Sequence, residues 1–173
     1  DRVKYQPRIA QCAQFLVDNQ CKNGQWSYGQ PTQIGAYEVD KSVSTAGGKT
    51  AGGVKEFDPA KFVRREKPKV TRRLVVKPAR DGPGEGDNSN SQYAALGLRA
   101  CYEAGILFPQ EVIFRARQWW LSCPIQSDNK KEPTAGWCYR YGTGYCKNPD
   151  TAYGSMTAGA VGALCIYDYM LGS

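Results

Sequence analysis

The fold class is decided by the stretch QCAQFLVDNQCKNGQWSYG, residues 11–29 of the 173-residue chain. Its first half continues an apolar stripe with the spacing of one helix face, formed by Ile9, Cys12, Ala13, Leu16 and Val17. Pro7 is placed as in the first turn of a helix, and Gly24 and Trp26 follow the stripe. The stretch therefore predicts an amphipathic helix over about 7–20 that leads into a glycine–tryptophan turn.

A second stretch of the same design, RARQWWLSCPIQSDNKKEPTAGWCYRYG, occupies residues 115–142. Here a helix is predicted over about 109–123 and ends at Pro124, because proline cannot continue a helix. The turn at Gly136 and Trp137 follows, so that Trp137 corresponds to Trp26. The helix-and-tryptophan unit thus occurs twice, which indicates an internal repeat.

Each unit is followed by a segment that is apolar almost all round, over about 90–104 and about 156–171. The two segments align at a constant offset of 66, which pairs Ser91 with Thr157. Ser89 and Gln92 have the spacing of a capping box for the first of them. Helices that are apolar all round are buried, and half-polar helices lie outside them. The order predicts a single all-α domain over 1–173, built from αα-hairpin repeats.

The first half carries an insertion at about 30–86 that the second half lacks. Residues 61–80 hold nine Lys or Arg against one Glu, whereas the whole chain has a net charge of +7. The segment 70–76, VTRRLVV, has strand propensity and could pair with 34–39 or 62–63 as a small ribbon. The candidate anion-binding residues are Arg64, Arg65, Lys67, Lys69, Arg72 and Arg73.

This basic insertion is compatible with several partners. Nucleic acid would be bound through phosphate neutralisation, but no aromatic residues interleave with the charges. Anionic lipid headgroups are a second option. An acidic surface of a partner or of a longer parent protein, or a simply solvated excursion, is the interpretation we favour.

Composition excludes several kinds of catalytic site. The chain has no histidine, so a Ser–His or Cys–His nucleophile cannot be built from it alone. Its seven cysteines form no paired clusters with zinc-ligand spacing, and we expect no metal or cofactor. Cys12, Cys101 and Cys165 lie in apolar helical patterns and are expected to act as small hydrophobes. Cys138 and Cys146 flank a glycine-rich loop, where a local disulfide is an option.

Tyrosines and acids are the remaining candidates. Tyr93 is a candidate for a cavity wall, and further tyrosines gather near the two turns, at Tyr28, Tyr139, Tyr141, Tyr145 and Tyr153. They could form a ligand-facing rim, although sealing the core is the interpretation we favour. Asp168 lies in an apolar helix, and a buried carboxylate there could donate a proton. We expect instead that solvent or an arginine accompanies it, and the same holds for Glu103; Asp150 is a further candidate acid.

These residues suggest a family. Phe15, Leu16, Gln20, Gly24 and Trp26 read F-L-x-x-x-Q-x-x-x-G-x-W, which resembles the QW repeat of squalene–hopene cyclases and of the related prenyltransferase repeats. The segments SNSQYAALGLRACYEAGI and SMTAGAVGALCI look like bacterial terpene cyclase/mutase-like repeat proteins. The resemblance covers about two-thirds of the chain, all but the insertion. It implies part of an α/α toroid in which Gln20, Gly24, Trp26, Gly136 and Trp137 are structural.

The resemblance carries over no catalytic residue. The D-x-D-D motif of the cyclases, the zinc ligands of the prenyltransferases and a G-C-G-E-Q thioester run are all absent from the sequence. We therefore expect a non-catalytic binding or scaffold module. The alternative is part of an isoprenoid cyclase or prenyltransferase whose catalytic acid lies outside this chain, and a second alternative is anionic-partner binding through the insertion. A toroid needs more than two hairpins, so the rest of a longer protein or other subunits are the expected partners.

Overall fold

The computed structural model describes residues 2–33, 70–126, 134–139 and 151–172. Within these ranges it has four long helices, α1 (Arg2–Asp18), α2 (Asn88–Glu103), α3 (Gln110–Ser122) and α4 (Gly154–Leu171). Four two-residue strands accompany them, β1 (Leu74–Val75), β2 (Ile106–Leu107), β3 (Ile125–Gln126) and β4 (Ala135–Gly136). The described part of the chain is mostly helical, which confirms the all-α prediction in its broad form.

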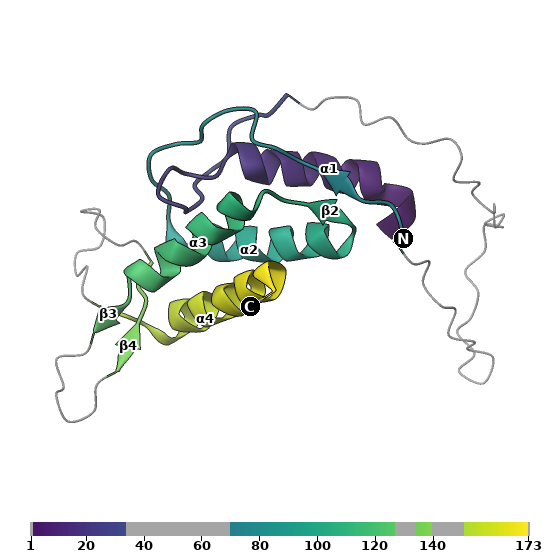
Figure 1. Cartoon of the computed structure of the whole chain (residues 1–173). Coiled ribbons are helices and arrows are strands. Elements are labelled where there is room, and N and C mark those ends of the chain that lie inside the picture. Colours follow the sequence, from purple (N-terminus) through teal and green to yellow (C-terminus); the bar gives the residue numbers. More distant parts are fainter. Residues whose placement is uncertain (1, 34–69, 127–133, 140–150, 173) are drawn as a thin grey trace, which may run out of the picture.

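The four helices pack around one hydrophobic core. Helix α2 packs mainly against α4, while α1 lies on α2 and α3 lies on α4 (Figure 1). The core between them contains the fully buried side chains of Leu98, Trp120 and Tyr167, together with small residues that allow close approach. Ala13, Ala95 and Ala160 are examples of those small residues, each without exposed surface.

Helix α1 begins earlier than predicted. It starts at Arg2, so Pro7 lies inside the helix rather than in its first turn. Proline lacks an N–H and removes one helical hydrogen bond, so other contacts must hold the additional turn. They come from the far end of α2: the Gln6 side chain donates to Ala104 O (2.9 Å), and Arg2 pairs with Glu103 (2.7 Å).

The predicted cap of α2 is also corrected. Asp87 precedes the helix, and its carboxylate accepts hydrogen bonds from the Asn90 N–H (2.7 Å) and the Ser89 hydroxyl (2.7 Å). The capping residue is therefore Asp87 and not Ser89. An acidic cap satisfies free N–H groups and also interacts favourably with the positive end of the helix dipole.

The segment predicted as a ribbon strand pairs with a different partner. Strand β1 runs parallel to β2, and Val76 N–H donates to Leu107 O at 3.1 Å. Val76 is buried, which gives this edge an apolar anchor. The two predicted partners, 34–39 and 62–63, lie outside the described residues. Strands β3 and β4 form a separate antiparallel pair between α3 and α4.

The prediction that α2 and α4 are buried all round is wrong. Tyr93 and Leu96 on α2 are 68% and 56% exposed, and Val161 and Tyr169 on α4 are 50% and 57% exposed. The physical reason is that α1, α3 and the α2–α4 contact cover only part of each helix. Both helices therefore keep an uncovered apolar side.

Candidate functional site

The first tryptophan turn joins the end of α1 to the start of α2. The indole N–H of Trp26 donates to Leu16 O (2.8 Å) and its backbone N–H donates to the Ser91 hydroxyl (2.9 Å). Its carbonyl accepts from the Asp87 N–H (2.9 Å). Trp26 is buried. Three hydrogen bonds from one residue thus fix the angle between the two helices.

Trp137 makes the matching three hydrogen bonds between α3 and α4. Its indole N–H donates to Trp120 O (2.9 Å), its backbone N–H to the Thr157 hydroxyl (3.1 Å), and its carbonyl accepts from Tyr153 N–H (3.2 Å). The ring also meets that of Trp120 edge-on, with centroids 6.5 Å apart. The hydroxyl partners are the residues that the offset of 66 pairs in the sequence.

The other residues of the motif also occupy structural positions. The Gln20 side chain donates to Val112 O (2.8 Å) at the start of α3. Gly24 has φ +96°, and a Cβ there would collide with the carbonyl of Arg115. At Gly136 a Cβ would lie 2.8 Å from the Thr157 hydroxyl. These contacts let the two turns approach neighbouring helices closely.

Asn88 was missed by the sequence analysis, although it links both turns. It is fully buried, and its Oδ1 accepts from Gln25 Nε2 (3.0 Å) and Trp119 Nε1 (2.8 Å). Its Nδ2 donates to Cys138 O (2.8 Å), and its backbone N–H donates to Tyr139 O (3.0 Å). A polar residue at the start of an apolar helix looks like a cap. Nothing in the local sequence indicates that Asn88 instead connects the two turns.

A second missed group lies at the end of α1, at the base of the insertion. Asp18 is buried, and its carboxylate accepts from Gln14 Nε2 (2.8 Å), Ala79 N–H (2.8 Å) and the Thr32 hydroxyl. The signal that could have found it is its position, because a carboxylate at a helix C-terminus is unfavourable unless other donors compensate.

The next residue extends this base. Asn19 Oδ1 accepts from Gln30 N–H (2.8 Å) and from the Arg80 guanidinium (2.8 Å). The chain therefore leaves and re-enters the helical body at one place. Arg80 belongs to the basic segment but is engaged here in a structural contact.

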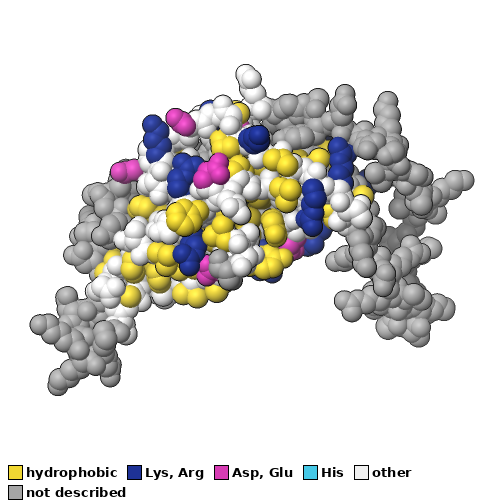
Figure 2. Space-filling model, in the orientation of Figure 1, with side chains coloured by type: hydrophobic (Ala, Val, Ile, Leu, Met, Phe, Trp, Pro, Cys, Tyr) yellow, Lys and Arg dark blue, Asp and Glu magenta, His cyan; other side chains and the backbone are white. Residues whose placement is uncertain are grey.

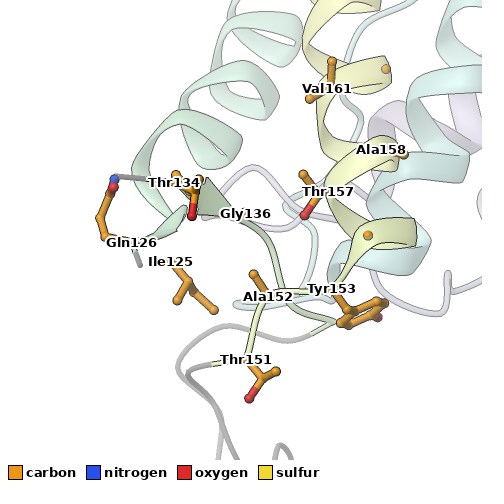
Figure 3. Close-up of a pocket in the computed structure, with 13 residues that line it drawn as sticks. Ile125, Gln126, Thr134, Gly136, Thr151, Ala152, Tyr153, Thr157, Ala158 and Val161 are labelled. Atoms are coloured by element: carbon orange, nitrogen blue, oxygen red, sulfur yellow. The ribbon is translucent and has the colours of Figure 1, made fainter. Parts of the chain in front are cut away.

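A groove lies beside the second turn, between the β3–β4 pair and the first half of α4 (Figure 3). Its volume is about 890 Å³, and no charged side chain of the described residues lines it. Small and apolar side chains dominate the lining, among them Ile125, Ala135, Ala152, Tyr153, Ala158 and Val161. This composition suits contact with an apolar surface.

The structure does not gather the predicted tyrosines into one site. Tyr153 lines the groove, whereas Tyr93 lies on the uncovered side of α2. Tyr28, Tyr139 and Tyr153 are 80%, 41% and 40% exposed, so they do not seal the core. Beside Tyr28 the buried position is taken by Trp26, and beside Tyr139 the partly buried residue is Trp137. Tyr141 and Tyr145 lie outside the described residues.

Both candidate acids within the described ranges are paired with arginine. Asp168 Oδ1 lies 2.6 Å from Arg117 Nε, across the α3–α4 contact. Glu103 lies 3.0 Å from Arg99 Nε, and the hydrogen bond from Arg99 lowers the pKa of its carboxyl group. The Arg99 partner favours the ionised form of Glu103, the opposite of what a proton donor needs. Asp150 lies outside the described residues.

The basic candidates fall mostly on undescribed residues. Arg64, Arg65, Lys67 and Lys69 lie outside the described ranges. Arg72 and Arg73 lie just before β1, where the Arg72 carbonyl accepts from Gln6 Nε2 (2.9 Å) and Arg73 is exposed. Anion binding by the insertion therefore stays a prediction.

Six cysteines fall in the described residues, and no disulfide forms among them. Cys101 is buried as expected, and burial raises the pKa of its thiol to about 12. Cys12 and Cys165 are exposed, so the expectation of buried small hydrophobes is wrong for them. They lie on the uncovered sides of α1 and α4. Cys146 lies outside the described residues, and its pairing with Cys138 stays a prediction.

No family model, curated protein or solved structure matches the chain. No helix in the described ranges is both long and apolar enough to cross a membrane. Among the same residues, no group of three or more potential ligands is placed to hold a metal ion.

Proposed function

We propose that the chain is a non-catalytic domain of two αα-hairpin repeats, α1–α2 and α3–α4, that resembles part of an α/α toroid and serves as a binding or scaffold module. The observation that carries the proposal is the matched set of three hydrogen bonds around Trp26 and Trp137. In each hairpin the tryptophan ties the end of one helix to the start of the next. Both tryptophan motifs therefore have a structural role, which is to hold consecutive helices together.

The acids support the same conclusion. Asp168 and Glu103 are each held by arginine, which suits an ion pair better than a proton donor. The groove beside α4 and the uncovered apolar sides of α2 and α4 are the surfaces on which a module of this kind would bind. Their chemistry favours an apolar protein partner.

The proposal is tested by Trp26→Phe and Trp137→Phe, which remove the indole N–H and keep an aromatic ring. Each variant leaves a carbonyl without its donor, so each should lower the free energy of unfolding by about 1–3 kcal/mol. The measurement is urea unfolding followed by circular dichroism. Tyr28→Phe is the control, because Tyr28 is 80% exposed, and it should leave the free energy of unfolding unchanged.

Two results would contradict the proposal. The first is a tryptophan variant with unchanged stability, because the motif would then not be a structural tie. The second is conversion of squalene or farnesyl diphosphate to product by the purified chain, because that would show a catalytic domain.

A further inference from the structure

The uncovered sides of α2 and α4 are related to the contact that these helices make with each other. This relation rests on the two-hairpin arrangement proposed above, in which position x of α2 corresponds to position x + 66 of α4. Ser91 and Thr157 obey it, since each hydroxyl accepts from a tryptophan N–H. The correspondence makes it possible to ask which face of α4 matches the face that α2 turns toward α4.

Two contacts define the α2–α4 interface. A Cβ placed on Gly159 of α4 would collide with the side-chain oxygen of Gln92 on α2, so these two residues face each other. Near the other end, the rings of Tyr102 and Tyr169 meet edge-on with centroids 5.9 Å apart. The face of α2 that receives α4 therefore runs along Gln92 and Tyr102.

On α4 the corresponding face is uncovered. Gln92 corresponds to Ala158 and Ala95 to Val161; Ala95 has no exposed surface, whereas Val161 is 50% exposed. We call Ala158, Val161 and Cys165 the forward face; all three are exposed, and the first two line the groove (Figure 3). Figure 2 shows hydrophobic side chains along the lower edge of the molecule, the side on which α4 lies in Figure 1. The forward face thus lacks the helix that α4 itself provides to α2.

The complementary face lies on α2. Gly159, through which α4 meets α2, corresponds to Tyr93, and Tyr93 is 68% exposed. Tyr93, Leu96 and Ala100 form what we call the rear face, and all three are exposed. One molecule therefore presents both halves of an α2–α4-like interface, the forward face on α4 and the rear face on α2.

The sizes of the side chains are reversed between the internal interface and the two free faces. Inside the molecule a long Gln92 covers Gly159. Between molecules the equivalent pair would be a small Ala158 beneath a large Tyr93. In both cases a small residue on one helix lies opposite a long or large one on the other, so the two helices can still approach closely.

The charges at the far end are also compatible. The pair equivalent to Tyr102 and Tyr169 is Asp168 against Glu103 of a neighbouring copy. Each carboxylate already carries its own arginine, Arg117 at 2.6 Å from Asp168 and Arg99 at 3.0 Å from Glu103. The two acids therefore meet as ion pairs and not as bare like charges.

We propose that the chain associates head to tail, with the rear face of α2 from a second copy seated in the groove on the forward face of α4. Such a contact joins different surfaces, so it forms rings where the rotation closes and open chains otherwise. The proposal names the partner of the binding module: another copy of the same chain.

The test measures native mass by light scattering over a concentration series. The wild-type chain should give species at multiples of 19.1 kDa. Tyr93→Lys on the rear face and Val161→Lys on the forward face should each reduce the mass to that of the monomer. An equimolar mixture of the two variants should form a dimer, because each partner retains the face that the other has lost.

Phe114→Lys is the control, since Phe114 is 52% exposed on α3 and lies on neither face. Circular dichroism verifies that every variant is folded. A monomeric wild type at all concentrations would overturn the proposal, as would a mixture of variants that stays monomeric. If the wild type is monomeric but the tryptophan variants still lose stability, the proposed function stands and only self-association fails.

Discussion

Asn88→Ala should be among the most damaging single changes in the helical body, and the structure sets its magnitude. The side chain is fully buried and makes three hydrogen bonds, to Gln25, Trp119 and Cys138. Alanine removes all three and takes the Asn88 acceptor away from two N–H donors, Gln25 Nε2 and Trp119 Nε1. At about 1 kcal/mol for each lost bond and more for stranded buried groups, the loss is about 3–5 kcal/mol.

That loss is a large fraction of the domain's free energy of unfolding, because domains of this size are stable by about 5–15 kcal/mol. The assay is urea unfolding followed by circular dichroism and tryptophan fluorescence. The transition midpoint should fall while its slope stays constant, since the surface exposed on unfolding hardly changes. Gln118→Ala, at an exposed position of α3, should stay within about 0.5 kcal/mol of the wild type. A loss below about 1 kcal/mol for Asn88→Ala would refute the reasoning, because the network would then contribute little.

Three further predictions address separate features. Gly24→Ala should cost about 3 kcal/mol or more in unfolding free energy, because φ is +96° and the new Cβ meets backbone. Glu103→Gln should lower stability by at most about 1 kcal/mol at neutral pH. The pKa of Glu103 is lowered by Arg99, so this difference should persist above the pKa of the unfolded chain and vanish as pH falls through the folded-state value. Iodoacetamide at pH 8 should alkylate exposed Cys12 long before Cys123, whose buried thiol has its pKa raised to about 12. Peptide mass spectrometry follows the order of labelling, and earlier labelling of Cys123 would contradict the prediction.

The helices were predictable because they depend on local periodicity. The stretch before Pro124 and the apolar segments after each turn predicted α2, α3 and α4 to within a turn, and the stripe that ends at Val17 predicted the end of α1. The start of α1 was missed, since Pro7 suits a first turn and only remote contacts justify another. Gln6 reaches residues 72 and 104, and no local pattern reports such distant partners.

The polar network was less predictable for the same physical reason. Asn88 and Asp18 contact residues 31 to 63 positions away in the chain. Their residue types are ordinary at helix ends, where caps and solvent account for most polar side chains. A carboxylate at the end of α1 is unfavourable by itself, and that was the single hint available. Burial and partners had to come from the three-dimensional arrangement.

The failed burial prediction for α2 and α4 locates the surface of greatest interest. A helix that is apolar on every side is expected to be covered on every side. Val161 and Leu96 have the composition of core residues and yet are at least half exposed. Such a patch costs solubility unless something covers it in the assembled state. Because the exposed residues of α4 correspond to residues of α2 that α4 itself covers, the disagreement indicates a missing neighbour rather than a sequence that folds poorly.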